Sequence, residues 1–271
     1  MTEVPNTGNE VVENSPRLKL DDAFTFRCDS GRPCFGKCCR DVSILLTPYD
    51  VLRLKRALHL SSTDFLDQHV VVMKAEDKQL PVVFLKMDPE THQCPFVGAQ
   101  GGCGVYADRP WACRMYPLGL AEPEAPDAAE RRFYFVVREE LCQGHDGACG
   151  TVRQWLEGQE IEPYEMMQVA FRPLIFHPSW RETEVIGPQK LSMFFMACYD
   201  LDRFRRFVLE TRFLDLFDVD EFRVEALRTD DEELLEFAFD WLAFTLFHEK
   251  RMKVKNNLAP RTGVPAAGVS G

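Results

Sequence analysis

The stretch FRCDSGRPCFGKCCR, from Phe26 to Arg40, decides how this chain is organised. It holds four of the ten cysteines in the sequence: Cys28, Cys34, Cys38 and Cys39. Glycine and proline residues lie between them, and turns allow several sulfur atoms to converge on one point. Because unligated cysteines in a core are normally scattered and solitary, this clustering predicts a metal site.

A second block, CPFVGAQGGCGVYADRPWACRMYP from Cys94 to Pro117, is also rich in glycine. It adds three more cysteines: Cys94, Cys103 and Cys113. We expect the two blocks to meet in space and to share inorganic ions, with the rest of the chain acting as scaffold.

The spacing of the first block differs from that of a zinc finger. It reads C-x5-C-x3-C-C, without the paired C-x2-C elements of zinc ribbons, and no histidine lies at finger spacing. Neighbouring side chains in an extended segment diverge, so Cys38 and Cys39 either serve two centres or divide ligation and packing between them. An iron–sulfur cluster accepts more varied sulfur directions than one zinc ion, so iron with sulfide is favoured and zinc is the alternative.

Composition limits the other function classes. The chain has 271 residues and a formal charge of −11, which argues against a general nucleic-acid binder. It shows no signal peptide and no apolar run of about 20 residues that would span a membrane. We therefore expect a cytoplasmic protein, in which reduced thiols favour metal over disulfides. A protein partner stays open.

The expected fold is α+β and mostly helical, with a loop-rich cysteine-cluster core, a few short strands and a C-terminal helical bundle. The expected divisions are a disordered N-terminus (1–20), a metal-binding domain (21–160), a helical region (161–254) and a flexible tail (255–271). Strands are predicted at Val70–Met73, Pro81–Met87 and Phe133–Val137. Helices are predicted after caps at Thr47, Ser61 and Thr151, and over Tyr164–Phe176, Leu191–Phe217 and Asp230–Val254.

Taken together, the two blocks resemble the YkgJ-type cysteine-cluster family over about residues 24–157. The second signature of that family falls on Cys94, Cys103, Tyr106, Arg109, Pro110, Cys113, Arg114, Tyr116 and Pro117. The resemblance implies chelation of zinc or iron. A later cysteine–glycine element of the family is similar to Cys142-Gln-Gly144 and implies Cys142 as an eighth ligand. The first block departs from the family by wider spacing before Cys34 and Cys38.

The family is distantly similar to flagellin lysine N-methylase, which is associated with a four-iron cluster. The resemblance therefore implies a 4Fe-4S cluster as the favoured cofactor, with redox or methyl-transfer chemistry nearby. Methylase activity is not carried over, because no glycine-rich strand-to-helix turn for S-adenosylmethionine is visible. Whether the chain is an enzyme stays open.

Other residues receive supporting roles. Arg109, Arg114 and Tyr106 are placed around the cofactor, where the arginines offset thiolate charge and the tyrosine packs over the loops. Cys198 is expected in the core, and His145 in a solvated loop. The alternative function is a structural zinc module that docks a protein partner without catalysis.

Overall fold

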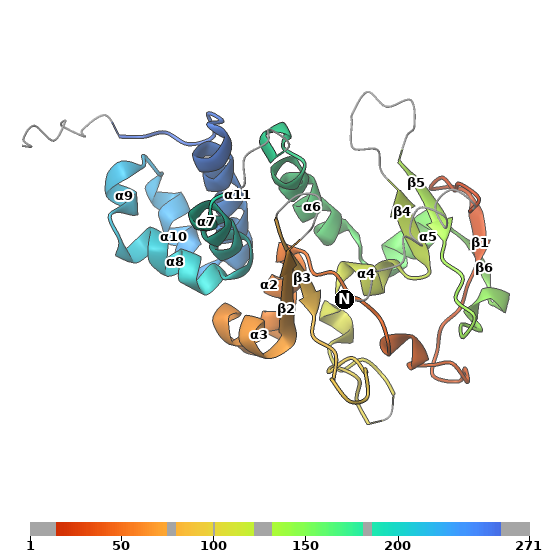
Figure 1. Ribbon diagram of the computed structural model, residues 1–271. Helices are drawn as coiled ribbons and strands as arrows, with labels where there is room; N and C mark the ends of the chain where they lie inside the picture. Colours follow the sequence, from red (N-terminus) through yellow and green to blue (C-terminus); the bar gives the residue numbers. More distant parts are fainter. Residues whose placement is uncertain (1–14, 75–79, 100, 122–131, 181–185, 256–271) are drawn as a thin grey trace, which may run out of the picture.

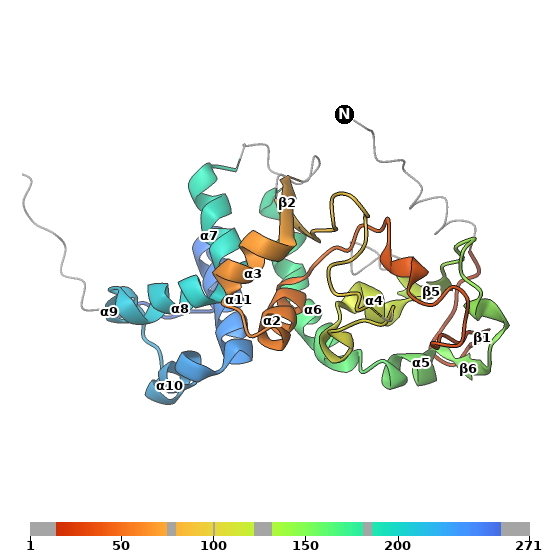
Figure 2. The same ribbon diagram turned by 90° about the horizontal axis from the view of Figure 1, so that it is seen from below.

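The computed structural model describes residues 15–74, 80–99, 101–121, 132–180 and 186–255. Its fold is α+β and mostly helical, as the sequence predicts. A helical bundle forms one end of the molecule, and the small strands and loops that carry the cysteines form the other (Figures 1 and 2). The predicted tail from residue 256 onward lies outside the described residues.

The predicted caps at the first helices are confirmed. Helix α2 (Pro48–Ala57) begins with a capping box, in which Thr47 and Asp50 each accept a hydrogen bond from the backbone of the other. Helix α3 (Ser62–His69) is capped by the Ser61 side chain. Helix α5 (Val152–Gly158) is capped by Thr151. Local chemistry alone therefore places these helix starts.

The three predicted strands are confirmed. Strand β2 (Val70–Lys74) pairs antiparallel with β3 (Pro81–Leu85), and β5 (Phe133–Val136) pairs with β4 (Leu118–Ala121). A third pair joins β1 (Ala23–Thr25) to β6 (Cys149–Thr151). The sequence did not indicate β1, β4 or β6, because three or four residues give no period. In β4, the ring of Phe135 lies where a side chain at Gly119 would be.

The C-terminal half is a bundle of α6 (Glu162–Ile175), α7 (Pro188–Tyr199), α8 (Leu201–Glu210), α9 (Phe213–Leu216), α10 (Glu221–Thr229) and α11 (Asp231–Phe247). The single helix predicted over Leu191–Phe217 is therefore wrong. The chain breaks at Asp200, whose carboxylate accepts hydrogen bonds from Ser62 and Thr63. A contact distant in sequence thus interrupts a continuous apolar period. Helix α11 ends before the predicted Val254, at His248 in a left-handed conformation.

Residues 15–20 belong to the segment that was expected to be disordered. In the structure, Leu18 exchanges two backbone hydrogen bonds with Tyr134, at 2.7 and 2.8 Å. This bridge adds a short extended segment beside β5. The start of the described chain is therefore held against the strands that lie next to the cysteine loops.

Two hydrophobic cores support the molecule. The larger one joins α2, α3 and β3 to the C-terminal bundle, through buried side chains such as Leu54, Phe65, Phe204 and Phe237. Cys198 is fully buried in this core, as expected. A smaller core lies beneath the cysteine loops and contains Met115, Leu118, Tyr134, Val152 and Ile161. The cysteine loops are therefore attached to a packed scaffold on one side and face solvent on the other.

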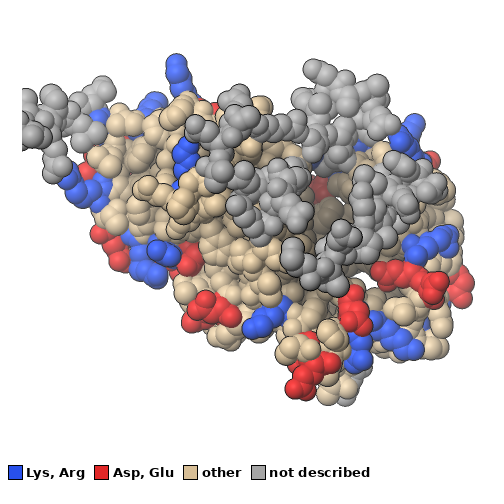
Figure 3. Space-filling view, viewed as in Figure 1, with Lys and Arg blue, Asp and Glu red and all other residues tan. Residues whose placement is uncertain are grey.

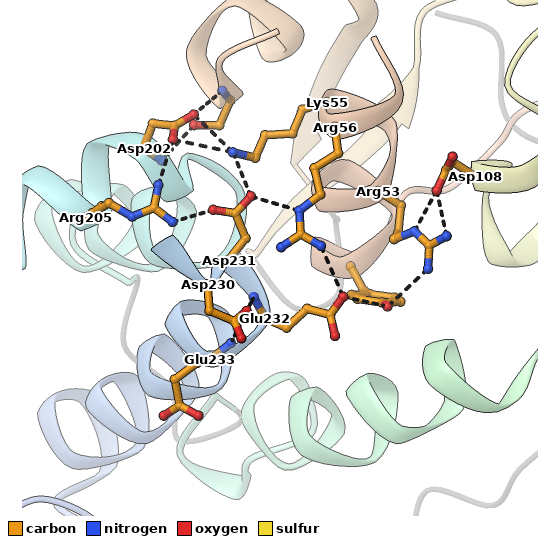
Figure 4. Close-up of polar contacts among 12 residues, drawn as sticks. Arg53, Lys55, Arg56, Asp108, Asp202, Arg205, Asp230, Asp231, Glu232 and Glu233 are labelled. Carbon is orange, nitrogen blue, oxygen red and sulfur yellow. Dashed lines mark hydrogen bonds and ion pairs between the residues drawn. The ribbon is translucent and has the colours of Figure 1, made fainter. Parts of the chain in front are cut away.

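A polar network fastens α2 to the bundle (Figure 4). The buried Lys55 ammonium lies 3.1 Å from Asp231 and 3.3 Å from Asp202. Arg56 reaches the same Asp231 carboxylate at 3.1 Å, and Arg205 also pairs with it. Since three cations surround two carboxylates at the edge of the core, the network fixes how α2 meets α8 and α11.

No helix among the described residues is long and apolar enough to cross a bilayer. On the face shown in Figure 3, acidic and basic side chains are interspersed and do not gather by sign.

Replacement of Lys55 by methionine tests the network. The substitution removes a positive charge from beside the partly buried carboxylates of Asp202 and Asp231. We therefore expect the free energy of unfolding to fall by about 2 kcal/mol. Arg228→Met is the control, because Arg228 and Glu225 form an exposed pair at 3.2 Å. It should change stability by less than about 0.5 kcal/mol. Urea denaturation measures both, and equal effects would contradict a special role for Lys55.

Candidate metal centre

The two cysteine blocks lie side by side. The backbone N–H of Cys94 donates to the carbonyl of Cys39 at 2.8 Å, and an antiparallel bridge joins Arg40 to Gln93. The expected meeting of the early and middle blocks is therefore present in the fold, although more than 50 residues separate Cys39 from Cys94 in sequence.

A close backbone contact accompanies this junction. Gly36 and Gly101 both adopt positive φ, at 75° and 83°. A Cβ atom at Gly36 would lie 2.5 Å from the carbonyl oxygen of Gly101. Only glycine permits both the conformation and the approach, so Gly36 allows the first loop to press against the second.

A third segment, from Cys142 to Ala148, closes over the first loop. The backbone N–H of Gln143 donates to the Cys34 sulfur at 3.4 Å. The backbone N–H of Arg27 donates to the Gly144 carbonyl at 2.9 Å, next to the turn η3 (Gly144–Asp146). Cys142 is thereby brought to cysteines more than 100 positions earlier in the chain.

The eight predicted ligands fall into two sets of four. The first, which we call the Cys28 group, contains Cys28, Cys34, Cys38 and Cys142. Burial raises the pKa of Cys28, and the nearby sulfurs of Cys38, Cys34 and Cys142 raise it further. Sulfurs this close to Cys28 make a site in which a cation is the natural counterpart.

The second set, the Cys39 group, contains Cys39, Cys94, Cys103 and Cys113. The thiol of Cys38 donates to the Cys39 sulfur, which lowers the pKa of Cys39, while the other three members of the group oppose its ionisation. Adjacent Cys38 and Cys39 thus belong to different groups and touch through their sulfurs. The side chains of Cys38 and Cys39 therefore do not diverge as expected for an extended segment, because these residues lie in the 3-10 turn η1 (Lys37–Cys39).

Cys113 is held by a short helix, α4 (Trp111–Met115). The buried carboxylate of Asp50 in α2 accepts from the backbone N–H of Trp111 at 2.7 Å and so anchors the start of α4. Burial raises the pKa of Asp50 to about 6. The Cys113 side chain is accessible to solvent but surrounded by protein on most sides, and this burial raises its pKa to about 12.

The two arginines beside Cys113 are used differently. Arg109 lowers the pKa of Cys113, opposing the effect of burial, and its guanidinium lies 3.8 Å from the centroid of the Tyr106 ring. Arg114 is 2% exposed and donates to the carbonyls of Arg109, Gln159 and Ala107. Arg109 is therefore the cation placed to offset thiolate charge, whereas Arg114 ties the loop to α5. Tyr106 is 60% exposed and forms the outer cover of Arg109.

Aromatic side chains support the Cys28 group. The buried ring of Phe26 lies 5.8 Å from Tyr116 and 5.4 Å from His145, centroid to centroid. The Tyr116 hydroxyl donates to the Glu139 carboxylate at 3.5 Å and lies close to Cys142. Sequence reasoning did not single out Phe26 or Asp50, because neither residue type by itself signals a metal site.

His145 differs from its expected place in a solvated loop. Both of its ring nitrogens are buried without a hydrogen-bond partner. In the sequence, the only indication that His145 lies near the cysteines is its position three residues after Cys142.

All ten cysteines lie in the described residues and are free thiols. Within the same residues, no three His, Cys, Asp or Glu side chains are arranged to hold one metal ion. Of the cysteines outside both groups, Cys149 is exposed on β6 and Cys198 is in the core.

A hollow of about 780 Å³ borders the Cys28 group at Cys38. Lys37 and Arg40 contribute to its lining from the first loop, and Glu139 and Glu140 from the chain before Cys142. The Cys28 group is thus reachable from solvent through a cavity that carries both signs of charge.

Comparison with known proteins gives one match. Residues 27–144 match a family model described as "CxxCxxCC: Putative zinc- or iron-chelating domain". This segment matches that cysteine-cluster family, in agreement with the resemblance seen in the sequence, and it spans all eight cysteines of the two groups. The match supports metal binding through the cysteines. No curated protein and no solved structure matches the chain.

Replacement of Gly36 by alanine tests the junction of the loops. We expect the Cβ to push Gly101 away, and the protein to retain less than half of its metal after gel filtration. Gly98→Ala is the matched control in the same pair of loops, where the new atom meets its nearest neighbour at an ordinary 3.6 Å. Elemental analysis of both purified variants provides the measurement. Full metal content in Gly36→Ala would show that the contact is dispensable.

Proposed function

We propose that this chain binds iron–sulfur clusters through two sets of four cysteine thiolates and serves in redox chemistry. The observation that carries the proposal is the division of eight thiols into the Cys28 group and the Cys39 group. Four thiolates are the usual ligand number for a four-iron cluster, and each group supplies that number. Such a cluster, when bound, provides a centre that accepts and releases single electrons.

The sequence spacing of the cysteines supports iron–sulfur clusters over zinc. The first block reads C-x5-C-x3-C-C, without the paired C-x2-C elements of structural zinc ribbons, and no histidine lies at finger spacing. An iron–sulfur cluster accepts more varied sulfur directions than one tetrahedral zinc ion, so it suits this irregular spacing better.

Groups around the sulfurs would tune the centres. The Gln143 N–H donates to the Cys34 sulfur, and the Tyr116 hydroxyl lies close to Cys142. Arg109 supplies positive charge beside Cys113. Hydrogen bonds and cations at ligating sulfurs stabilise the more negative, reduced state of a cluster and so raise its reduction potential. The two groups have different surroundings, so we expect two different potentials.

The hollow beside Cys38 is the proposed place for a redox partner or substrate to approach. Methyl transfer stays a prediction from the resemblance. The glycine-rich loop Gly98–Gly104 is closed on itself by a Gly98–Gly102 backbone bond of 2.8 Å and leads into the turn η2 (Tyr106–Asp108). It lacks the strand-to-helix geometry that binds a dinucleotide or similar cofactor.

The alternative function is a structural zinc module that docks a protein partner. It uses the same eight cysteines, with zinc in place of iron and without labile sulfide. A cytoplasmic location belongs to both proposals, since the thiols must be kept reduced.

Metal and sulfide analysis of anaerobically purified protein tests the proposal. We expect about eight iron and eight sulfide per chain, from two clusters of four. Cys142→Ala and Cys113→Ala should each lose about half of the iron, because each removes a ligand from a different group.

Cys149→Ala and Cys198→Ala serve as controls and should keep all of the iron, since neither residue belongs to a group. Colourless protein with stoichiometric zinc would favour the alternative function. Complete loss of iron in both ligand variants would show that the eight thiols hold one centre and not two.

A further inference from the structure

The half-buried imidazole of His145 lacks partners in the described fold. Both Nδ1 and Nε2 are covered by protein and make no hydrogen bond, and Gln168 Nε2 is the one other such side-chain atom of the described residues. A buried polar atom without a partner destabilises a fold. In native proteins such a group normally indicates a water, ion or other group that completes it.

The position of His145 indicates which group that is. It lies in η3, and Cys142 lies just before this turn, three residues earlier. The backbone of the same segment already touches the Cys28 group, through the Gln143 N–H and the Cys34 sulfur. His145 is therefore built into the wall of this group.

Backbone acceptors near the imidazole are already used. The Gly144 carbonyl accepts from the backbone N–H groups of Arg27 and Gly147, and the Gln143 carbonyl accepts from Arg32. The Phe26 ring, 5.4 Å away, offers no strong acceptor. The Glu139 carboxylate is also near the imidazole, but neither ring nitrogen is hydrogen-bonded to it. Metal-bound sulfurs of the Cys28 group are the acceptors that would complete the ring.

We infer that His145 donates an N–H hydrogen bond to a metal-bound sulfur of the Cys28 group. The inference rests on the proposed function and extends it, because it names a residue that sets the electron affinity of one centre and not of the other. His145 would act as a positioning residue, and its ring and that of Tyr116 both lie against the Phe26 ring. A hydrogen bond to a ligating sulfur favours the reduced cluster, so its loss lowers the reduction potential.

The test uses His145→Phe in the full chain, purified anaerobically with its iron. Phenylalanine preserves the ring contact with Phe26 and removes both nitrogens. We expect full iron and sulfide content, an unchanged unfolding midpoint, and a more negative reduction potential for one of two clusters in a spectroscopic titration. His145→Asn, which restores an N–H donor, should return part of the shift.

His177→Phe is the matched control, because His177 also stacks on a phenylalanine, Phe247 at 3.7 Å, but lies in the bundle. It should leave both potentials unchanged. Unaltered potentials in His145→Phe would overturn the inference, and so would loss of half of the iron, which would make His145 a ligand. The same shift in Glu139→Gln would also overturn it, by indicating that His145 acts through that nearby carboxylate.

Failure of the proposed function is recognised separately, in the unsubstituted protein, by zinc in place of iron and sulfide. In that event the inference is tested on the zinc protein. His145→Phe should release zinc to a chromogenic chelator several-fold faster than both the unsubstituted protein and His177→Phe. Equal release rates would overturn it.

Discussion

The close approach of two loop backbones is the constraint on which the cysteine end of the molecule depends. Gly36 and Gly101 meet at a distance that excludes a side chain, and the Cys39 carbonyl accepts from the Cys94 N–H beside them. Regular structure in the two blocks is limited to short turns and to helix α4, which carries Cys113. The mutual contact of the two loops therefore does much of the work of placing the other sulfurs.

The scaffold serves this junction through a few buried polar groups. The Asp50 carboxylate has two roles. It completes the capping box of α2, and it accepts a hydrogen bond from the backbone N–H of Trp111, the first residue of α4, which carries Cys113. Arg114, on the same helix, binds three backbone carbonyls. Because buried polar groups are costly unless fully paired, these contacts favour a single placement of α4. These contacts thereby fix the position of the cysteine-bearing loops relative to the packed core.

Sequence reasoning reached those features that are local. Helix caps at Thr47, Ser61 and Thr151 follow from residue types three positions apart, and the cysteine blocks follow from spacing and from a family resemblance. The break at Asp200 could not be found in this way, because Ser62 and Thr63 create it from far away in the chain. The partner segments β1 and β6 are too short to show a period. His145 was assigned to solvent because its loop is polar, and only the packing of Phe26 reveals its burial.

The adjacency of Cys38 and Cys39 has a consequence for any exchange between the two groups. Their side chains begin on consecutive α-carbons, and the thiol of one bonds to the sulfur of the other. A single peptide unit therefore sets the gap across which an electron would tunnel. Movement elsewhere in the chain would not change that gap. In the proposed arrangement, the rate of electron transfer between the two centres would therefore be fixed locally.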